Sequence, residues 1–91
     1  MEKPSSYDLI IIGAGPAGLA ASIYASRYRI KHLILGQQPG GTITLAHKVE
    51  NYPGFPSLSG PQLGQKFMEH AKSLGAEIEN KEVVEIKKEN N

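Results

Sequence analysis

The sequence predicts an α/β fold built on a parallel β-sheet, because its first apolar segments alternate between strand-like and helix-like patterns. Residues 7–12 are largely hydrophobic and end at Gly13, as expected for a strand that is buried on both faces. Residues 16–28 are rich in alanine, leucine and isoleucine, and Pro16 stands in what would be the first helical turn. Residues 32–35 form a second short apolar segment. A strand, a helix and a strand within about 30 residues have the length of one βαβ unit, whose strands run parallel.

A second helix and two more strands are expected in the C-terminal half. Apolar residues recur at helical spacing from Pro61, and Gly75 stands where the C-terminal cap of a helix belongs. Residues 76–79 are expected to form a third strand. Val84 and Ile86 alternate with charged residues and predict a fourth strand that is half exposed.

Size and composition limit the function. The chain has 91 residues, of which 40% are hydrophobic and 21% charged, and this suits one small domain or part of a larger one. Its ten basic and nine acidic residues give a net charge of +1, which argues against binding a nucleic acid or a membrane through bulk charge. The absence of cysteine excludes a disulfide scaffold, a thiolate metal site and any thiol chemistry by this chain itself.

The N-terminal segment predicts neither a membrane span nor a secretion signal. The longest aliphatic stretch, residues 9–12, is far shorter than the roughly 20 residues that a membrane-spanning helix needs. Glu2, Pro4 and Asp8 interrupt the basic region that a signal peptide requires. We therefore expect a cytoplasmic protein.

The strongest functional signal is the GxGxxG motif GAGPAG at residues 13–18, between the first predicted strand and the first predicted helix. In such a motif Gly13 allows the tight turn, Gly15 lets the backbone approach a pyrophosphate, and Gly18 lets the helix pack closely on the strand. The free N–H groups at the helix start bind negative charge. In this context the motif favours a Rossmann-like dinucleotide site over an ordinary glycine-rich turn.

The acidic residue that commonly binds the adenosine ribose about 20 residues after this motif is absent. No aspartate or glutamate occurs between Asp8 and Glu50, and the second predicted strand is followed by Gly36, Gln37 and Gln38. A glutamine amide can hydrogen-bond ribose hydroxyls, so either glutamine could take over this contact. The alternative is that both are solvated loop residues.

Two further motifs lie in residues 36–60, a connection with no sustained periodicity. They are Gly40-Gly41-Thr42 and the stretch VENYPGF at residues 49–55. Together with residues 7–18 and the helix start after Ser59, these motifs resemble the N-terminal part of the low-molecular-weight thioredoxin reductases, flavoproteins that bind FAD and NADPH in two similar domains. The resemblance extends from about residue 7 to residue 86. The alkyl hydroperoxide reductase flavin subunit and ferredoxin-dependent relatives share the same motifs.

This resemblance implies a set of FAD-binding residues and no catalytic residue within the chain. The implied set is Gly13, Gly15, Pro16 and Ala17 at the pyrophosphate, Gly36, Gln37 and Gln38 at the adenosine, and Gly40, Gly41, Thr42 and Asn51 at the ribityl chain and isoalloxazine ring. An asparagine amide offers both a donor and an acceptor, as the edge of a flavin does. The sequence departs from the family where Gly36 replaces a common acidic residue and Thr42 a common glutamine. The dispersed histidines, His32, His47 and His70, predict no metal site.

The implied function is that of a flavin-dependent disulfide oxidoreductase, a thioredoxin reductase that passes electrons from NADPH or another reductant through FAD to a thioredoxin-like protein disulfide. The family's Cys-x-x-Cys pair and second GxGxxG are absent here, so NADPH would bind to a domain absent from this chain. We expect residues 1–91 to be a partial FAD-binding domain, an α/β lobe incomplete at its C-terminus and inactive alone. A homodimer is compatible with the resemblance, and no nucleic-acid or membrane partner is expected. The alternatives are a non-catalytic dinucleotide-binding fragment and a lobe of another FAD- or NAD-dependent oxidoreductase.

Overall fold

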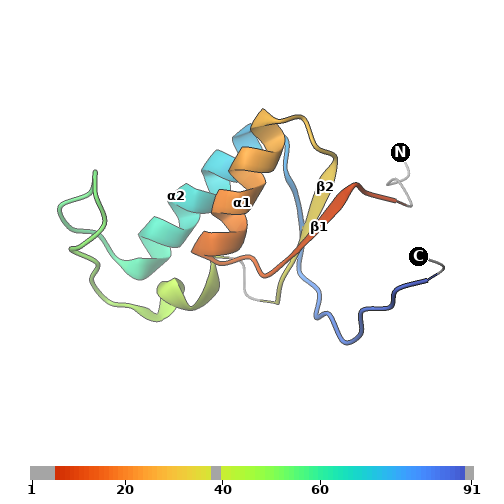
Figure 1. Ribbon diagram of the computed structural model, residues 1–91. Helices are drawn as coiled ribbons and strands as arrows, with labels where there is room; N and C mark the ends of the chain where they lie inside the picture. The colour runs from red at the N-terminus through yellow and green to blue at the C-terminus, as the bar shows by residue number, and fades with distance from the viewer. Residues whose placement is uncertain (1–5, 38–39, 90–91) are drawn as a thin grey trace.

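Two helices cover one face of a three-stranded parallel sheet in the computed structural model, which describes residues 6–37 and 40–89 (Figure 1). In chain order the elements are β1 (Leu9–Ile12), α1 (Pro16–Arg27), β2 (His32–Leu35), the short 3₁₀ helix η1 (Gly41–Leu45), α2 (Gly60–Ser73) and β3 (Glu77–Glu79). The strand order is β1-β2-β3, and both strand pairs are parallel. The α/β fold, both helices and the first three strands are thereby confirmed.

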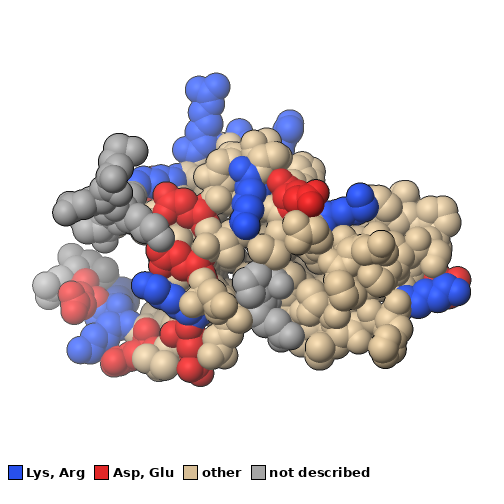
Figure 2. Space-filling model, turned by 180° about the vertical axis from the view of Figure 1, so that it is seen from behind, with Lys and Arg blue, Asp and Glu red and all other residues tan. Residues whose placement is uncertain are grey.

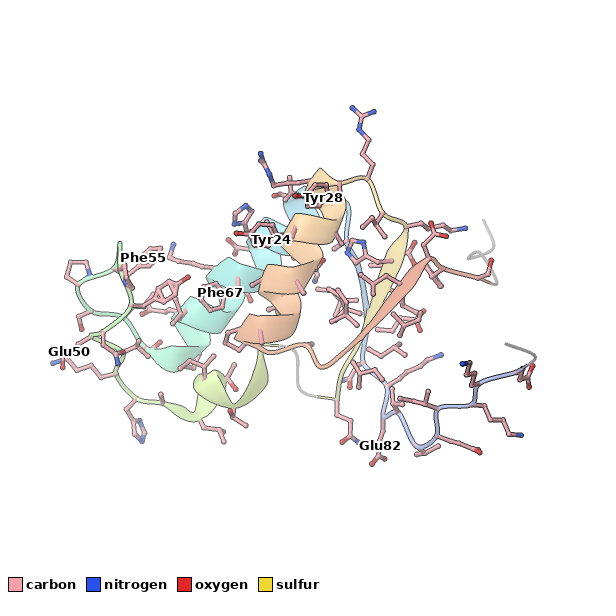
Figure 3. The ribbon with its side chains drawn as sticks, in the orientation of Figure 1. Tyr24, Tyr28, Glu50, Phe55, Phe67 and Glu82 are labelled. Atoms are coloured by element: carbon pink, nitrogen blue, oxygen red, sulfur yellow. The ribbon has the colours of Figure 1, made fainter. Side chains whose placement is uncertain are left out.

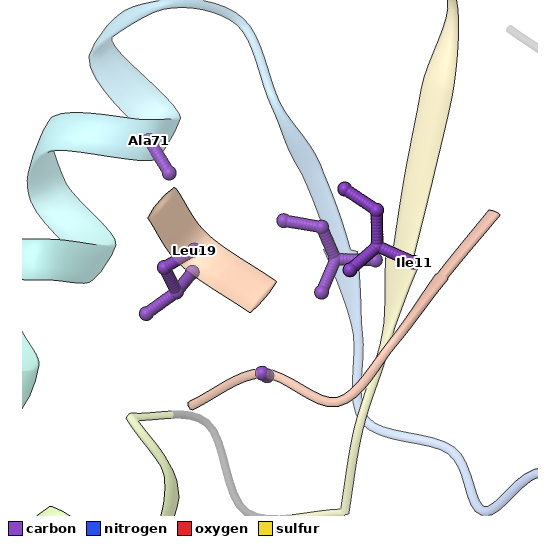
Figure 4. Packing of buried hydrophobic residues seen from close by; sticks show 5 residues of the cluster. Ile11, Leu19 and Ala71 are labelled. Atoms are coloured by element: carbon purple, nitrogen blue, oxygen red, sulfur yellow. The ribbon is translucent and has the colours of Figure 1, made fainter. Parts of the chain in front are cut away.

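Three isoleucines, one from each strand, are the sheet's contribution to the hydrophobic core. Ile11 pairs with Ile34, and Ile34 pairs with Ile78, so the three side chains lie on the same face of the sheet. Leu19 of α1 and Ala71 of α2 are fully buried in the same cluster (Figure 4). Burying a leucine side chain contributes roughly 1.5–3 kcal/mol. This cluster packs α1 against the face of the sheet, and the first turn of α1 follows soon after the end of β1.

The two helices begin differently. Helix α2 has a complete capping box, in which the Gln62 N–H donates to Ser59 Oγ at 3.2 Å and the Ser59 N–H donates to Gln62 Oε1 at 2.9 Å. Helix α1 has Gly15 as its N-cap, with no side-chain cap and no acidic residue in its first turn. The first N–H groups of α1 are thus left without a side-chain acceptor, whereas those of α2 have one.

Two buried polar side chains tie α1 to the start of β2. The Nε2 atom of His32 lies 2.7 Å from Ser22 Oγ, and its Nδ1 atom lies 2.8 Å from the Ile30 carbonyl oxygen. Because that carbonyl can only accept, Nδ1 carries the proton and Nε2 accepts from the serine hydroxyl. Both ring nitrogens of His32 are therefore used inside the fold.

The expectation that the first strand is buried on both faces is wrong for the described chain. Ile11 faces the helices and is 9% exposed, but Ile10 and Ile12 on the opposite face are 43% and 53% exposed. Strand β1 lies at the edge of the sheet, and both helices lie on the same side of it (Figure 1). Apolar residues on both faces make a strand suitable for two-sided burial, but only neighbouring elements can cover it.

The predicted fourth strand does not form within residues 80–89. Val84 and Ile86 are 86% and 78% exposed, and the sheet ends at β3. An alternating sequence gives a strand one apolar and one polar face. A strand also needs a neighbouring strand to hydrogen-bond its backbone N–H and C=O groups. In the described chain this segment has no such partner strand.

The connection over residues 36–60 is more ordered than its composition predicts. Besides η1, it contains two isolated antiparallel bridges, one between Val49 and Leu58 and one between Tyr52 and Phe55. The Tyr52 ring packs against Phe67 of α2 with ring centroids 5.2 Å apart. None of the described helices is long and apolar enough to cross a membrane.

Candidate functional site

Two glycines of the GAGPAG motif are required by the fold itself. Gly13 has φ = +114°, a conformation that other residues rarely adopt, and its N–H donates to the Leu35 carbonyl at 2.7 Å. A Cβ on Gly18 would collide with the Gly13 carbonyl oxygen, because α1 packs directly on the preceding turn. These two glycines let the chain reverse from β1 into α1 within three residues.

Gly15 is not required by the fold in the same way. Its backbone is extended, with φ = −87° and ψ = −172°, which any residue can adopt. A Cβ there would meet only the Gly41 Cα, at an ordinary contact distance of 3.5 Å. The protein thus leaves the space beside Gly15 at the uncapped start of α1 free. This combination suits the close approach of an anionic group to the backbone.

The Gly-Gly pair packs against the GAGPAG motif. The Gly40 N–H donates to the Ala14 carbonyl at 2.7 Å, and a Cβ on Gly41 would lie only 2.6 Å from the Gly15 Cα. Gly41 also has φ = +74°. Thr42 follows in η1 with an exposed side chain. Two motifs that are more than 20 residues apart in the sequence are therefore neighbours in space.

The segment after β2 is held between the glycine motif and the end of β3. A Cβ on Gly36 would lie 2.8 Å from both the nitrogen and the Cβ of Ala14, so no larger residue fits at this position. The Gly36 N–H donates to the Glu79 carbonyl at 3.1 Å. With its amide oriented so that the nitrogen faces them, the Asn80 side chain donates to the carbonyls of Gly36 and Gln37 at 3.2 and 2.8 Å. Gln37 itself is exposed, and Gln38 lies outside the described residues.

A cavity of about 190 Å³ lies at the carboxyl ends of β1 and β2. Its lining residues are Ile12, Gly13, Leu35, Gly36, Gln37, Lys81, Glu82 and Val83. Open parallel sheets bind their ligands at this edge. Three residues expected at the dinucleotide, Gly13, Gly36 and Gln37, therefore share one cavity, whose volume suits part of a dinucleotide rather than the whole molecule.

Sequence reasoning missed Glu82, the acidic residue of this cavity. The side chain lies at the lower edge of the sheet in Figure 3, below the ends of the strands. Figure 2 shows that charged residues gather at the sheet end of the molecule, whereas the opposite end is almost uncharged. The sequence could have indicated Glu82, because it comes three residues after the third strand. Parallel strands bring their carboxyl ends to the same edge of the sheet, so a residue just after this strand is expected near the end of β1.

Asn51 lies in a different part of the molecule. It is exposed and lines a separate cavity of about 490 Å³ formed by residues 50–56. The neighbouring labelled residues Glu50 and Phe55 lie on the far side of the helices from Glu82 (Figure 3). The structure therefore brings the described residues expected at the pyrophosphate and the adenosine together with the Gly-Gly pair, but it does not bring Asn51 to them.

Comparison with known proteins places this arrangement in a family. The family model for pyridine nucleotide-disulphide oxidoreductases matches residues 7–91. Thioredoxin reductase from Bacillus subtilis is 46% identical over 87 residues, which cover 94% of this chain and 28% of the relative.

Two solved structures share the fold. Thioredoxin reductase from Lactococcus lactis has a TM-score of 0.77 and 41% identity, covering 81% of this chain and 25% of the other. A ferredoxin-flavin thioredoxin reductase from Clostridium acetobutylicum also has a TM-score of 0.77, with 42% identity over 85% of this chain and 27% of the other. The chain thus spans about a quarter of the length of these relatives. With the family model matching nearly all of its residues, the chain belongs to the pyridine nucleotide-disulphide oxidoreductase family.

Proposed function

We propose that residues 1–91 form part of the FAD-binding domain of a thioredoxin reductase, which passes electrons from a reductant through FAD to the disulfide of a thioredoxin-like protein. One observation carries the proposal: Gly15 is a glycine that the fold does not need, at the uncapped start of a helix and beyond the end of a parallel strand. A bound pyrophosphate explains this glycine, because a Cβ would stand in its way.

The described residues fit FAD at three places. The N-terminus of α1, with Gly15 as its N-cap, suits the pyrophosphate, because its first N–H groups point away from the helix body and no side chain caps them. The cavity at the ends of β1 and β2 suits the adenosine. Gly40 and Gly41, packed on the glycine motif, extend the same surface toward the flavin part.

FAD would supply the electron-transfer chemistry, and the chain's own residues would bind and orient it. The 91 residues contain no cysteine, so a dithiol that reduces thioredoxin would come from another part of the protein. The reductant would also bind elsewhere. NADPH is the one we propose, and the similarity to a ferredoxin-flavin thioredoxin reductase makes ferredoxin the alternative.

A hybrid enzyme tests the proposal. Residues 7–86 replace the corresponding segment of the Bacillus subtilis thioredoxin reductase, which is 46% identical over 87 residues. We expect the purified hybrid to contain about one FAD per chain and to oxidise NADPH only when thioredoxin is present. The control is the same hybrid carrying Gly15→Val. A hybrid that folds by circular dichroism but contains no FAD would contradict the proposal.

A further inference from the structure

We propose that Glu82 binds the adenosine ribose of the dinucleotide, in place of the acidic residue that is missing at the end of β2. The inference rests on the proposed FAD-binding function and assigns one of its contacts. Glu82 lines the cavity at the carboxyl ends of β1 and β2 together with Gly13, Gly36 and Gln37. This is the edge at which dinucleotide-binding sheets place the adenosine.

An acidic side chain does not fit at Gly36 with the backbone of this chain as it stands. A Cβ on Gly36 would lie 2.8 Å from the backbone nitrogen of Ala14, which belongs to the glycine motif and cannot move without displacing it. A carboxylate that binds the ribose hydroxyls would therefore come from another element. Among the residues that line the cavity, only Glu82 carries one.

Contacts of Glu79 and Asn80 hold the start of the segment that carries Glu82 beside this cavity. The Glu79 carbonyl accepts from the Gly36 N–H, and the Asn80 amide bridges the carbonyls of Gly36 and Gln37. These three contacts join the start of the segment that carries Glu82 to the segment that follows β2. The position of Glu82 is thus coupled to the position of the residues expected at the adenosine.

The charge of Glu82 is available to a ligand. The neighbouring Lys81 forms an ion pair with Glu79, whose Oε2 atom lies 3.4 Å from Nζ. Within the described residues, Glu82 itself takes part in no hydrogen bond or ion pair and is exposed. A free carboxylate can accept from two adjacent hydroxyls at once, as a ribose offers them. The same charge repels a phosphate on the ribose 2′ position.

The experiment measures nucleotide binding to the full 91-residue chain by NMR titration, read at the amides of Gly13 and Gly36. The probes are ADP, which carries the adenosine and pyrophosphate of FAD, 2′-deoxy-ADP and adenosine 2′,5′-bisphosphate. The variants are Glu82→Gln and Glu82→Ala. Glu85→Gln is the matched control, because it removes an equal charge from an exposed position outside the cavity.

For the unmodified chain we expect ADP to bind about tenfold more tightly than 2′-deoxy-ADP, a difference of about 1.4 kcal/mol. Both Glu82 variants should lose this preference and tolerate adenosine 2′,5′-bisphosphate better, whereas Glu85→Gln should behave like the unmodified chain. Equal binding of ADP and 2′-deoxy-ADP by the unmodified chain, or an unchanged preference in Glu82→Gln, would overturn the role of Glu82 and leave FAD binding intact. Failure of the unmodified chain to bind any of the three probes would also overturn the role of Glu82, and the FAD content of the hybrid enzyme would decide separately whether the dinucleotide site exists.

Discussion

The close contact between Gly41 and Gly15 is asymmetric. A Cβ on Gly41 would lie 2.6 Å from the Gly15 Cα, whereas a Cβ on Gly15 would lie 3.5 Å from the Gly41 Cα. Gly41 also has φ = +74°, while the backbone of Gly15 is extended. The two glycines in direct contact therefore meet different requirements: Gly41 is needed for packing and for its backbone conformation, whereas Gly15 leaves space beside the start of α1. Separate substitutions distinguish the two roles.

Gly15→Ala should abolish or strongly weaken FAD binding while the protein keeps its fold. The new methyl group meets only an ordinary contact within the protein, so the free energy of unfolding should fall by no more than about 1 kcal/mol. It would occupy the space proposed for the pyrophosphate, and Gly15→Val would do so more completely. Isothermal titration of the apo hybrid enzyme with FAD measures the loss. Unchanged affinity in both variants would mean that no part of FAD occupies the space beside Gly15.

Gly41→Ala should destabilise the fold itself. Its left-handed backbone costs an alanine about 1–2 kcal/mol, and the short contact with Gly15 adds to this cost. Urea unfolding of the hybrid enzyme without FAD should show a lower midpoint than for Gly15→Ala. If the two variants unfold at the same urea concentration, the packing of the Gly-Gly pair on the motif contributes nothing to stability.

Ser22→Ala should destabilise the protein by about 1–3 kcal/mol, because it leaves Nε2 of the buried His32 without a hydrogen-bond partner. FAD affinity should change little, since both side chains are used inside the fold and neither lines the cavity at the strand ends. Thermal unfolding and FAD titration of the same hybrid variant measure the two effects. A variant as stable as the unmodified protein would show that the hydrogen bond between Ser22 and His32 does not contribute to stability.

Asn51→Leu should shift the absorbance or the reduction potential of the flavin more than it shifts stability, if the amide contacts the ring edge as the family resemblance implies. Asn51 is exposed, so its loss should leave the melting temperature nearly unchanged. The flavin spectrum of the FAD-loaded hybrid enzyme is the measurement. An unchanged spectrum with a large fall in melting temperature would make Asn51 a structural loop residue.

The 91-residue chain alone should show no disulfide reductase activity, because it contains no cysteine to accept electrons from a flavin. It should also bind FAD weakly, since one face of its sheet is uncovered at Ile10 and Ile12. The assay mixes the chain with FAD, NADPH and thioredoxin and follows NADPH oxidation beside a control without protein. Thioredoxin-dependent oxidation above that control would refute the prediction.

The sequence by itself determined the order of the elements and the place of the glycine motif. The boundaries of β2 and the start of α1 agree with the prediction, because a βαβ unit depends on local patterns: an apolar strand, a glycine turn and a helix that begins with Pro16. These signals lie within a few residues of the elements that they specify. They needed no knowledge of distant contacts.

Tertiary structure alone decided which residues meet. Three features depend on elements far apart in the sequence: whether β1 is covered on one face or two, whether Val84 and Ile86 find a partner strand, and which acidic residue lines the cavity at the strand ends. Glu82 lies almost 70 residues after Gly13, yet both line one cavity, because parallel strands deliver their carboxyl ends to the same edge of the sheet. A sequence pattern shows which face of a helix or strand is apolar, but only the packed structure determines which other residues that face contacts.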